Sequence, residues 1–345
     1  MKTKKRVAVY IGRFQPVHNG HVEVIEHCKR NYDQTLVLIG SCNKRRSVKN
    51  PFHWKMIIEW LKEAGADNIG LLSDYIYDDA LWVEQVKSVV EDFYSKEEYE
   101  FTIVGHDKDA SSFYLKLFPE YHSELLPPLA YGISATEIRE AFFSDDLSSV
   151  YKHLPYYVGN AIYDFKLNSA TRTQYEDLKE EYVYFQKEKE KFKDYPYKDT
   201  LKFNCADAVV YCNGGILLIK RKKAPGKGAW ALPGGFVNTN ETYLQAAKRE
   251  LLEETGLDIT KFELVDEESD LICNIFDHPS RGCGIPRITG AYVFHIRYPH
   301  NDVPEITPSD DAIEAKWFGL NEIAEMVLHD DHKDIIETFY DLKDF

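Results

Sequence analysis

The chain has 345 residues, of which 44% are hydrophobic and 29% charged, and its net charge is −15; this length favours two domains, and the acidic balance argues against a nonspecific nucleic-acid binder. No uninterrupted apolar run approaches the ~20 residues that a membrane-spanning helix needs, so we expect no membrane partner. The six cysteines form no C-x-x-C pair and no zinc-like spacing, which favours free thiols and a cytoplasmic location.

The first third of the chain alternates short apolar runs, typical of buried parallel strands, with helical patterns. A basic start followed by an apolar run also fits a signal peptide, but charge returns at Arg13. The alternation predicts a doubly wound α/β domain on a parallel sheet, whose ligands bind beyond the carboxyl ends of the strands. The predicted strands are 7–11, 35–39, 69–72, 101–104 and a weak one at 124–126, and the predicted helices are 21–30, 53–64 and 82–94.

A turn with two histidines follows the first predicted strand directly, at 12–21 (GRFQPVHNGH). Pro16 and Gly20 shape this turn, and a helix that begins here offers backbone N–H groups to a phosphate. His18 and His21 lie three residues apart, so both imidazoles can converge on one phosphate. A lone histidine here would more often be structural, but a pair that brackets a glycine at a strand-to-helix turn favours a functional site.

The tetrapeptide HNGH at 18–21 resembles the H-x-G-H signature of the nucleotidyltransferase superfamily, and 133–139 (ISATEIR) resembles its triphosphate-binding I-S-x-T-x-x-R motif. Alone, the second string could be a helix N-terminus capped by Ser134. The resemblance implies in-line adenylyl transfer from ATP with Mg²⁺. It also implies that His18, His21 and Arg139 are catalytic, and that Gly12, Arg13, Phe14, Ser134, Thr136 and Arg139 bind ATP.

Further segments make the first half look like the archaeal-type nicotinamide mononucleotide (NMN) adenylyltransferases: 41–52 with its Asn50-Pro51-Phe52 element, Trp82 in the following helix, and 105–109 (GHDKD). The resemblance implies that Asn50, Phe52 and Trp82 bind NMN, with Trp82 stacked on the cationic nicotinamide ring. The structural alternative for Trp82 is a core aromatic. The basic run 44–46 departs from the family pattern, and its charge suits an anionic substrate. Pantetheine phosphate, flavin mononucleotide and a cytidylyl acceptor remain alternative substrates.

Residues 171–198 are dense in Glu, Lys and Tyr and predict a charged helix followed by a Pro-containing connector. We therefore place a nucleotidyltransferase domain with its linker helix at 1–183 and a second domain at 197–345. The second domain has β character and predicts a mixed sheet flanked by helices in an α/β/α arrangement. Its predicted strands are 208–211, 215–220, 291–297 and 315–318, and its closing helices are 321–328 and 334–342.

A long gapped pattern at 235–257 (GFVNTNETYLQAAKRELLEETGL) is the most informative segment of the chain. Glu250, Glu253 and Glu254 lie at i, i+3 and i+4, so on a helix they crowd one face and repel one another. Divalent cations such as Mg²⁺ or Mn²⁺, which prefer oxygen ligands, would neutralise them. The alternative is a solvated acidic face with Arg249 and Glu253 paired, but such a face does not require the glycines at these offsets.

This segment resembles the Nudix box, and 230–235 (WALPGG) resembles the family's entry into it. The resemblance implies hydrolysis of a nucleoside diphosphate linked to another group, with Mg²⁺ as the metal and Mn²⁺ as the alternative. It implies that Glu250, Glu253, Glu254 and Gly235 bind the metal, that Glu253 and Glu254 are catalytic, that Arg249 and Glu241 support them, and that Gly256 caps the helix.

The two resemblances cover nearly the whole chain, which is therefore similar to the bifunctional NMN adenylyltransferase/Nudix hydrolases, with ATP, NMN and ADP-ribose as small-molecule partners. The box does not define the group attached to the diphosphate, so residues outside the box would select it. The candidates are Trp230, Arg281, Arg287 and the loop 305–314. One of the four carboxylates in this loop could be the general base. The open alternatives are another nucleoside diphosphate derivative, a hydrolase of oxidised nucleotides, and a non-enzymatic ADP-ribose sensor. A homo-oligomer is also left open.

Overall fold

The computed structural model describes residues 4–106, 117–127, 132, 134–264 and 273–342. The chain divides into two compact units, Met1–Lys179 and Glu180–Phe345. The division falls inside helix α7, Arg172–Lys191, which is the charged helix expected near the end of the first domain. Within the described residues, no helix combines the length and apolar character that crossing a bilayer requires.

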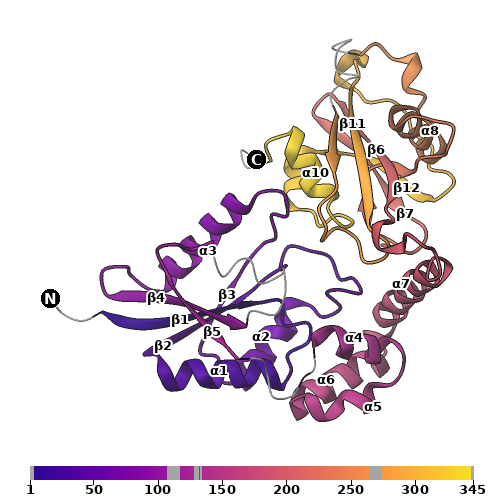
Figure 1. Cartoon of the computed structure of the whole chain (residues 1–345). Helices are drawn as coiled ribbons and strands as arrows, with labels where there is room; N and C mark the ends of the chain where they lie inside the picture. The colour runs from indigo at the N-terminus through magenta and orange to yellow at the C-terminus, as the bar shows by residue number, and fades with distance from the viewer. Residues whose placement is uncertain (1–3, 107–116, 128–131, 133, 265–272, 343–345) are drawn as a thin grey trace. The chain divides into compact units, whose positions relative to one another are not determined.

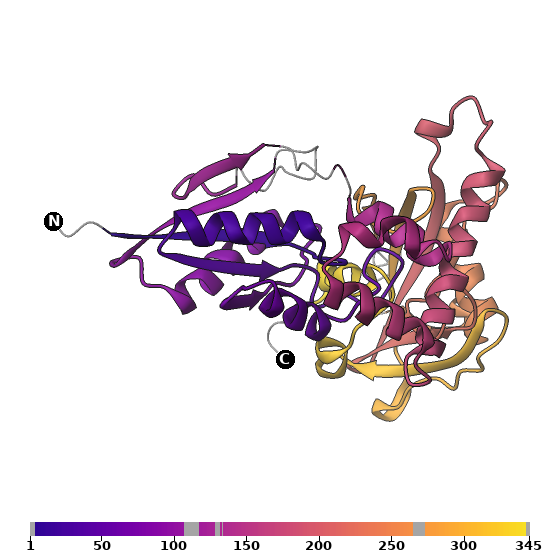
Figure 2. The same ribbon diagram turned by 90° about the horizontal axis from the view of Figure 1, so that it is seen from below.

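The first unit is built on a five-stranded sheet with the order β3-β2-β1-β4-β5, in which neighbouring strands are all parallel. Alternate side chains of β1, among them Val7 and Val9, pack with Val86 and Val90 of α3. Figure 1 shows α1 and α3 on opposite sides of the sheet, and Figure 2 shows α1 lying along it. The predicted doubly wound parallel sheet is confirmed. Its elements are β1 (Lys5–Gly12), α1 (Asn19–Asn31), β2 (Gln34–Ile39), α2 (Trp54–Glu63), β3 (Asn68–Leu71), α3 (Asp79–Phe93), β4 (Tyr99–His106), β5 (His122–Leu126), α4 (Ala135–Phe143), α5 (Leu147–Val150), η2 (Tyr151–His153) and α6 (Tyr156–Leu167).

The second unit is built on a mixed sheet with the order β10-β11-β6-β7-β12; β8 adds to β7, and β9 adds to β6. Along β6, Ala206 and Ala208 pack toward α8, whereas Val209 packs toward α10. Figure 1 shows α8 and α10 on opposite sides of this sheet, which confirms the predicted α/β/α arrangement. Its elements are η3 (Lys198–Thr200), β6 (Phe203–Cys212), β7 (Gly215–Arg221), β8 (Trp230–Ala231), β9 (Gly234–Phe236), α8 (Tyr243–Thr255), η4 (Ile259–Lys261), β10 (Cys273–Phe276), β11 (Arg287–His295), η6 (Pro299–Asn301), β12 (Ala312–Gly319), α9 (Leu320–Glu325) and α10 (His332–Phe339).

Candidate active sites

The histidine turn lies at the carboxyl end of β1, where α1 begins. His18 is the N-cap of α1, and its Nδ1 accepts a hydrogen bond from the Gly20 N–H at 3.2 Å. The His18 N–H in turn donates to Nδ1 of His21 at 3.2 Å, and the His21 N–H donates to the His18 carbonyl oxygen. The sequence predicted open N–H groups for a phosphate here. Instead, these three amides close the first turn of the helix.

The capping bonds determine which nitrogen of each imidazole carries the proton. A neutral imidazole whose Nδ1 accepts a hydrogen bond has its proton on Nε2. His18 and His21 therefore both have an Nε2–H donor, and their rings stack with centroids 3.7 Å apart. His18 is only 1% exposed, whereas His21 is half-buried, so His21 is the more accessible donor.

Phe14 supports His21 from inside the protein. Its backbone has φ +53°, and its ring packs edge-on against His21 and Tyr10 with centroid separations of 5.0 Å and 5.3 Å. A Cβ on Gly12 would lie 3.0 Å from this ring, closer than ordinary packing allows, so a larger residue there would push on Phe14. Because the Phe14 side chain is 2% exposed, a contact of this residue with ATP would have to come from its backbone.

Gln15 joins the three sequence motifs of the first unit, a role that the sequence did not reveal. Its amide nitrogen donates to the Phe52 carbonyl oxygen at 2.8 Å, and the Phe52 N–H donates to its amide oxygen at 3.0 Å. Arg139 donates through Nη1 to the Gln15 carbonyl oxygen at 2.7 Å and through Nη2 to Thr136 Oγ1 at 3.0 Å. The segments 12–21, 50–52 and 134–139 are thus tied together at one place.

The Phe52 ring lies in the core, so the predicted contact of Phe52 with NMN does not come from its side chain. The ring is 2% exposed and packs against Trp60, Phe142 and Phe165, with centroids 5.2 to 5.8 Å away. Any contribution of Phe52 to binding would therefore come through the backbone that Gln15 holds. Asn50, by contrast, has a buried Oδ1 without a hydrogen-bond partner among the described residues, which suits an acceptor for a donor on a ligand.

The remaining predicted residues of the first unit have mixed placements. Trp82 lies in the first turn of α3, half-buried, with its ring 5.9 Å from that of Phe118; its stacking on nicotinamide stays a prediction. Arg46, in the basic run 44–46, donates a hydrogen bond to Gln174 and lies over the Phe165 ring; the fit of this run to an anionic substrate stays a prediction. Ser134 caps α4 and exchanges hydrogen bonds with Glu137. Residues 107–109 and 133 lie outside the described residues.

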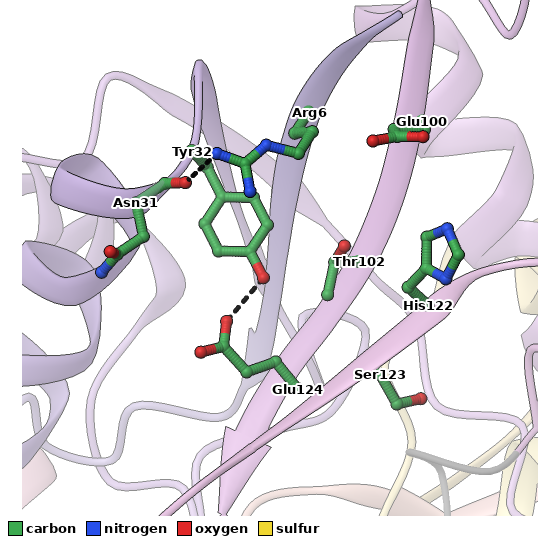
Figure 3. Close-up of a pocket in the computed structure, with 8 residues that line it drawn as sticks. All are labelled: Arg6, Asn31, Tyr32, Glu100, Thr102, His122, Ser123 and Glu124. Atoms are coloured by element: carbon green, nitrogen blue, oxygen red, sulfur yellow. Dashed lines mark hydrogen bonds between the residues drawn. The ribbon is translucent and has the colours of Figure 1, made fainter.

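An open hollow of about 470 Å³ lies at the amino ends of β1, β4 and β5, the edge of the sheet opposite to the histidines. Figure 3 shows hydrogen bonds between residues that line it: Tyr32 donates to Glu124 at 2.5 Å, and Arg6 donates to the Asn31 backbone carbonyl oxygen at 2.7 Å. Burial, followed by the bond to Glu124, raises the pKa of Tyr32 to about 12. Because the nucleotide motifs lie at the carboxyl ends of the strands, we assign no adenylyl-transfer chemistry to this hollow.

In the second unit, two glycines bring the backbone next to buried carboxylates. Gly234 and Gly235 pair with Asp207 and Ala206 of β6. A Cβ on Gly235 would lie 2.4 Å from Oε1 of Glu250, and one on Gly234 would lie 2.1 Å from Oδ1 of Asp207. A side chain at Gly234 would also meet the Ala206 carbonyl oxygen at 2.5 Å, so glycine is needed there, whereas a side chain at Gly235 would displace the Glu250 carboxylate.

Glu250 and Glu254 reach this turn from α8. The helix begins at the Thr242 N-cap and ends at Gly256, whose φ of +70° is the left-handed cap expected there. Glu254 is 3% exposed and accepts a hydrogen bond from the Gly234 N–H at 3.0 Å. Its pKa is raised to about 8, mainly by burial and also by the nearby carboxylates Glu250 and Asp207. Burial also raises the pKa of Glu250.

Arg249 is the centre of an ion-pair network on the same helix. It makes two hydrogen bonds to Glu241, at 2.6 and 2.9 Å, and single ones to Glu250 and Glu253, at 2.7 and 2.8 Å. These contacts lower the pKa of Glu241 to about 2, chiefly through its bond to Arg249. The pair of Arg249 and Glu253 that a solvated face would make does exist. The burial of Glu250 and Glu254, however, is not explained by a solvated face.

The chemistry of this cluster fits a divalent cation. As they stand, no three His, Cys, Asp or Glu side chains in the described part of the chain enclose an ion by themselves, and Glu253 is 45% exposed and turned to Arg249. Mg²⁺ commonly uses one or two carboxylates and completes its shell with water and substrate phosphates. Glu250, Glu254 and the backbone at Gly235 meet that requirement, and a cation would offset the raised pKa values of the two carboxyl groups.

The loop that follows η6 packs against the last turn of α8. The Thr307 N–H donates to the Thr255 carbonyl oxygen, and Ser309 donates to the carbonyl oxygens of Glu254 and Glu253. Asp310 follows directly, with φ +51°, and its charge raises the pKa of Glu250. Two of the other candidate bases are paired with lysines, Asp311 with Lys223 at 2.7 Å and Glu314 with Lys220 at 2.8 Å.

Two arginines proposed as substrate contacts are bound elsewhere. Arg281 forms a buried ion pair with Asp331 at 2.9 Å, in which the two side chains are 6% and 1% exposed, so this expectation is wrong. Arg287 pairs with Glu188 at 2.7 Å. The Trp230 ring packs edge-on against Phe318, 4.7 Å away.

The sequence did not reveal which residues hold the segment 230–232, which leads into the glycine turn. Nδ1 of His332, at the start of α10, accepts a hydrogen bond from the Leu232 N–H at 2.9 Å. The His329 N–H donates to the Trp230 carbonyl oxygen at 2.8 Å. Burial lowers the pKa of His332 to about 3, so this ring is a neutral acceptor at physiological pH.

Both halves of the chain match family models and known proteins. Residues 9–141 match the cytidylyltransferase-like family, and residues 202–339 match the NUDIX domain. A nicotinamide/nicotinic acid mononucleotide adenylyltransferase of Acinetobacter baylyi is 36% identical over 39% of this chain and 74% of its own length. An ADP-ribose pyrophosphatase of Methanocaldococcus jannaschii is 36% identical over 39% of this chain and 70% of its own length.

Two crystal structures resemble the chain over both units. A bifunctional NMN adenylyltransferase/ADP ribose pyrophosphatase from Francisella tularensis has a TM-score of 0.83 and 31% identity, over 97% of this chain and 98% of that one. A structure of a protein of the same description and organism, complexed with AMP and a Mn ion, has a TM-score of 0.82 and 30% identity over the same shares.

Proposed function

The chain belongs to the family of bifunctional NMN adenylyltransferase/ADP-ribose pyrophosphatases, and we propose from this that it is an enzyme of NAD metabolism with two separate centres. The first unit transfers AMP from ATP to NMN, giving NAD and pyrophosphate. The second unit hydrolyses ADP-ribose to AMP and ribose 5-phosphate. The observation that carries this proposal is that one chain holds both the stacked His18 and His21 rings and the Glu250–Glu254 cluster. We place the enzyme in the cytoplasm, in keeping with its free cysteines.

In the first unit the 5′-phosphate oxygen of NMN attacks the α-phosphorus of ATP in line, and the bond from that phosphorus to the β-phosphate bridge breaks. His18 and His21 would donate from Nε2–H to the α-phosphate oxygens as charge develops there. Arg13, Ser134, Thr136 and Arg139 would hold the triphosphate. Asn50 and Trp82 would hold NMN, and no covalent intermediate with the enzyme is required.

In the second unit a water oxygen attacks a phosphorus of ADP-ribose, and the bridging P–O bond breaks to release AMP and ribose 5-phosphate. Glu250, Glu254 and the Gly235 backbone would hold Mg²⁺ or Mn²⁺, and Glu253 is the third predicted carboxylate ligand. The ion would polarise the phosphoryl oxygens and lower the pKa of bound water. Arg249 orients Glu250 and Glu253, and Glu241 neutralises part of its charge.

Asp310 is our candidate for the group that takes the proton from the attacking water. Of the four carboxylates in its loop, it follows the segment bonded to the end of α8 and acts electrostatically on Glu250. Changing Asp310 to Asn is expected to lower kcat for ADP-ribose hydrolysis roughly 10²–10⁴-fold with little change in KM. The matched control is Asp311→Asn, which removes only the exposed pair with Lys223. Equal kcat values for the two variants would exclude Asp310 as the base.

The proposal as a whole is tested by chromatography of reaction products. We expect NAD and pyrophosphate when the protein is incubated with NMN, ATP and Mg²⁺, and AMP and ribose 5-phosphate when it is incubated with ADP-ribose and Mg²⁺. Retention of ADP-ribose without cleavage would favour a sensor instead. Preferential cleavage of oxidised nucleoside triphosphates in competition would favour a house-cleaning hydrolase.

A further inference from the structure

Phe236 is a large aromatic side chain that is both exposed and held in place. It directly follows Gly235 at the end of β9, and it remains 47% exposed. Its ring meets that of Phe203 edge-on at 5.5 Å, and the Arg287 guanidinium lies 5.9 Å from its centroid. A phenyl ring supported on these sides but open to solvent is a preformed surface for another flat ring.

The backbone of Phe236 is tied to the carboxylate centre. Its carbonyl oxygen accepts a hydrogen bond from Nη2 of Arg249 at 3.0 Å, and the same guanidinium binds Glu241, Glu250 and Glu253. Phe236 is also paired with Cys205 in the antiparallel register of β9 and β6, so its backbone is held by the neighbouring strand. The ring therefore begins one residue from the turn against which the Glu250 carboxylate packs.

Arg287 supports the ring and is not a second phosphate-binding group. Its guanidinium pairs with Glu188 at 2.7 Å and donates to the Ile285 carbonyl oxygen at 3.0 Å. Its guanidinium carbon also lies 5.9 to 6.0 Å from the ring centroids of Phe185, Phe203 and Phe236. An arginine that is already neutralised and surrounded by aromatic faces stiffens those faces through cation–π contact.

We propose that the Phe236 ring is the stacking platform for the purine base of the nucleoside diphosphate substrate. This inference rests on the proposed hydrolysis of ADP-ribose and assigns the base end of that substrate. The base is the only extended aromatic group in ADP-ribose, so an exposed phenyl ring on the residue after Gly235 would select that end of the molecule. Stacking of one base on an aromatic side chain corresponds to roughly a tenfold gain in affinity or more.

The test compares two products that differ only in the base. AMP and ribose 5-phosphate are titrated by calorimetry in Mg²⁺ into the full-length protein and into Phe236→Leu, which keeps an apolar side chain but removes the aromatic face. We expect the variant to bind AMP about tenfold more weakly and ribose 5-phosphate unchanged. Its KM for ADP-ribose should rise by a similar factor, with kcat within about threefold. Phe236→Tyr should restore AMP binding, and Val327→Ala, at a side chain 50% exposed outside the box, should have no effect.

Two results would overturn the stacking platform. Unchanged AMP binding in Phe236→Leu would exclude contact with the base, and equal weakening of AMP and ribose 5-phosphate would show that the ring only holds the turn. The proposed function fails separately, through absence of ADP-ribose cleavage by the unaltered protein. Since AMP binding is measured directly, the role of Phe236 is decided in that case too.

Discussion

Replacing His21 with alanine is expected to lower adenylyl transfer by roughly 10²–10³-fold, the usual loss when one preorganised donor to a developing charge is removed. His21 is the more accessible ring of the stacked pair, and because its Nδ1 accepts the His18 N–H, its donor is Nε2–H. Hydrolysis of ADP-ribose by the same variant should stay within about twofold of the unaltered protein. The measurement is initial-rate formation of NAD and of AMP in separate assays of one preparation.

A second variant distinguishes loss of the donor from damage to the helix start. In His21→Asn the side-chain oxygen can still accept the His18 N–H, so the first turn of α1 stays capped. We expect His21→Asn to lose NAD synthesis almost as fully as His21→Ala while keeping the melting temperature of the unaltered protein. Loss of both activities in either variant would contradict two independent centres.

Changing Glu254 to Gln is expected to lower ADP-ribose hydrolysis at least 10²-fold and to leave NAD synthesis unchanged. The amide keeps an oxygen that can accept the Gly234 N–H, but it cannot supply the charge that a divalent cation requires. Titration of Mn²⁺ followed by electron paramagnetic resonance should therefore show weaker binding. The control Glu263→Gln changes an exposed carboxylate paired with Arg297 and should leave both measurements unchanged.

The same variant has an expected effect on stability without metal. The pKa of Glu254 rises from 4.5 to about 8 in the folded protein, mainly through burial, so folding favours its protonated form. Its stabilising contribution is complete below pH 4.5 and is lost as the pH rises toward 8. Glu254→Gln removes this loss, and its metal-free melting temperature at pH 8 should equal or exceed that of the unaltered protein. A large fall in that temperature would show that the carboxylate stabilises the metal-free fold.

Elements with a regular apolar pattern were predictable from the sequence, whereas short or mixed elements were not. The strands β1 and β2 and the helix α8 appear where continuous apolar runs and the gapped glutamate pattern placed them. The strands β8 and β9 have two and three residues, too few for any periodicity. The helix α6 was missed because it is apolar nearly all round: Val158 and Ile162 are buried, but Tyr156 and Leu167 remain exposed. Apolar residues on the exposed face as well as on the buried one obscure the helical period.

The candidate residues of both centres came from spacing along the chain, but their supports come from distant segments. Gln15 is adjacent to the histidine motif, yet its importance depends on Phe52 and Arg139, which only the folded chain brings to it. The same limit applies to Asp207, whose carboxylate packs against Gly234 across a strand pair. Phe52 shows the reverse case, in which a residue chosen for a ligand contact is a core side chain because several other aromatics surround it.

The bond from Leu232 to His332 links residues a hundred positions apart, and this separation bears on the order in which the two centres mature. A ribosome releases the chain from its amino end, and domains generally fold as they emerge. The parallel sheet and its histidine turn can close while the rest is still being synthesised. In the second unit, however, the segment before the glycine turn lacks its hydrogen bond from Leu232 to His332 until the start of α10 has left the exit tunnel. A nascent chain halted before that point would thus already make NAD but would not yet degrade ADP-ribose.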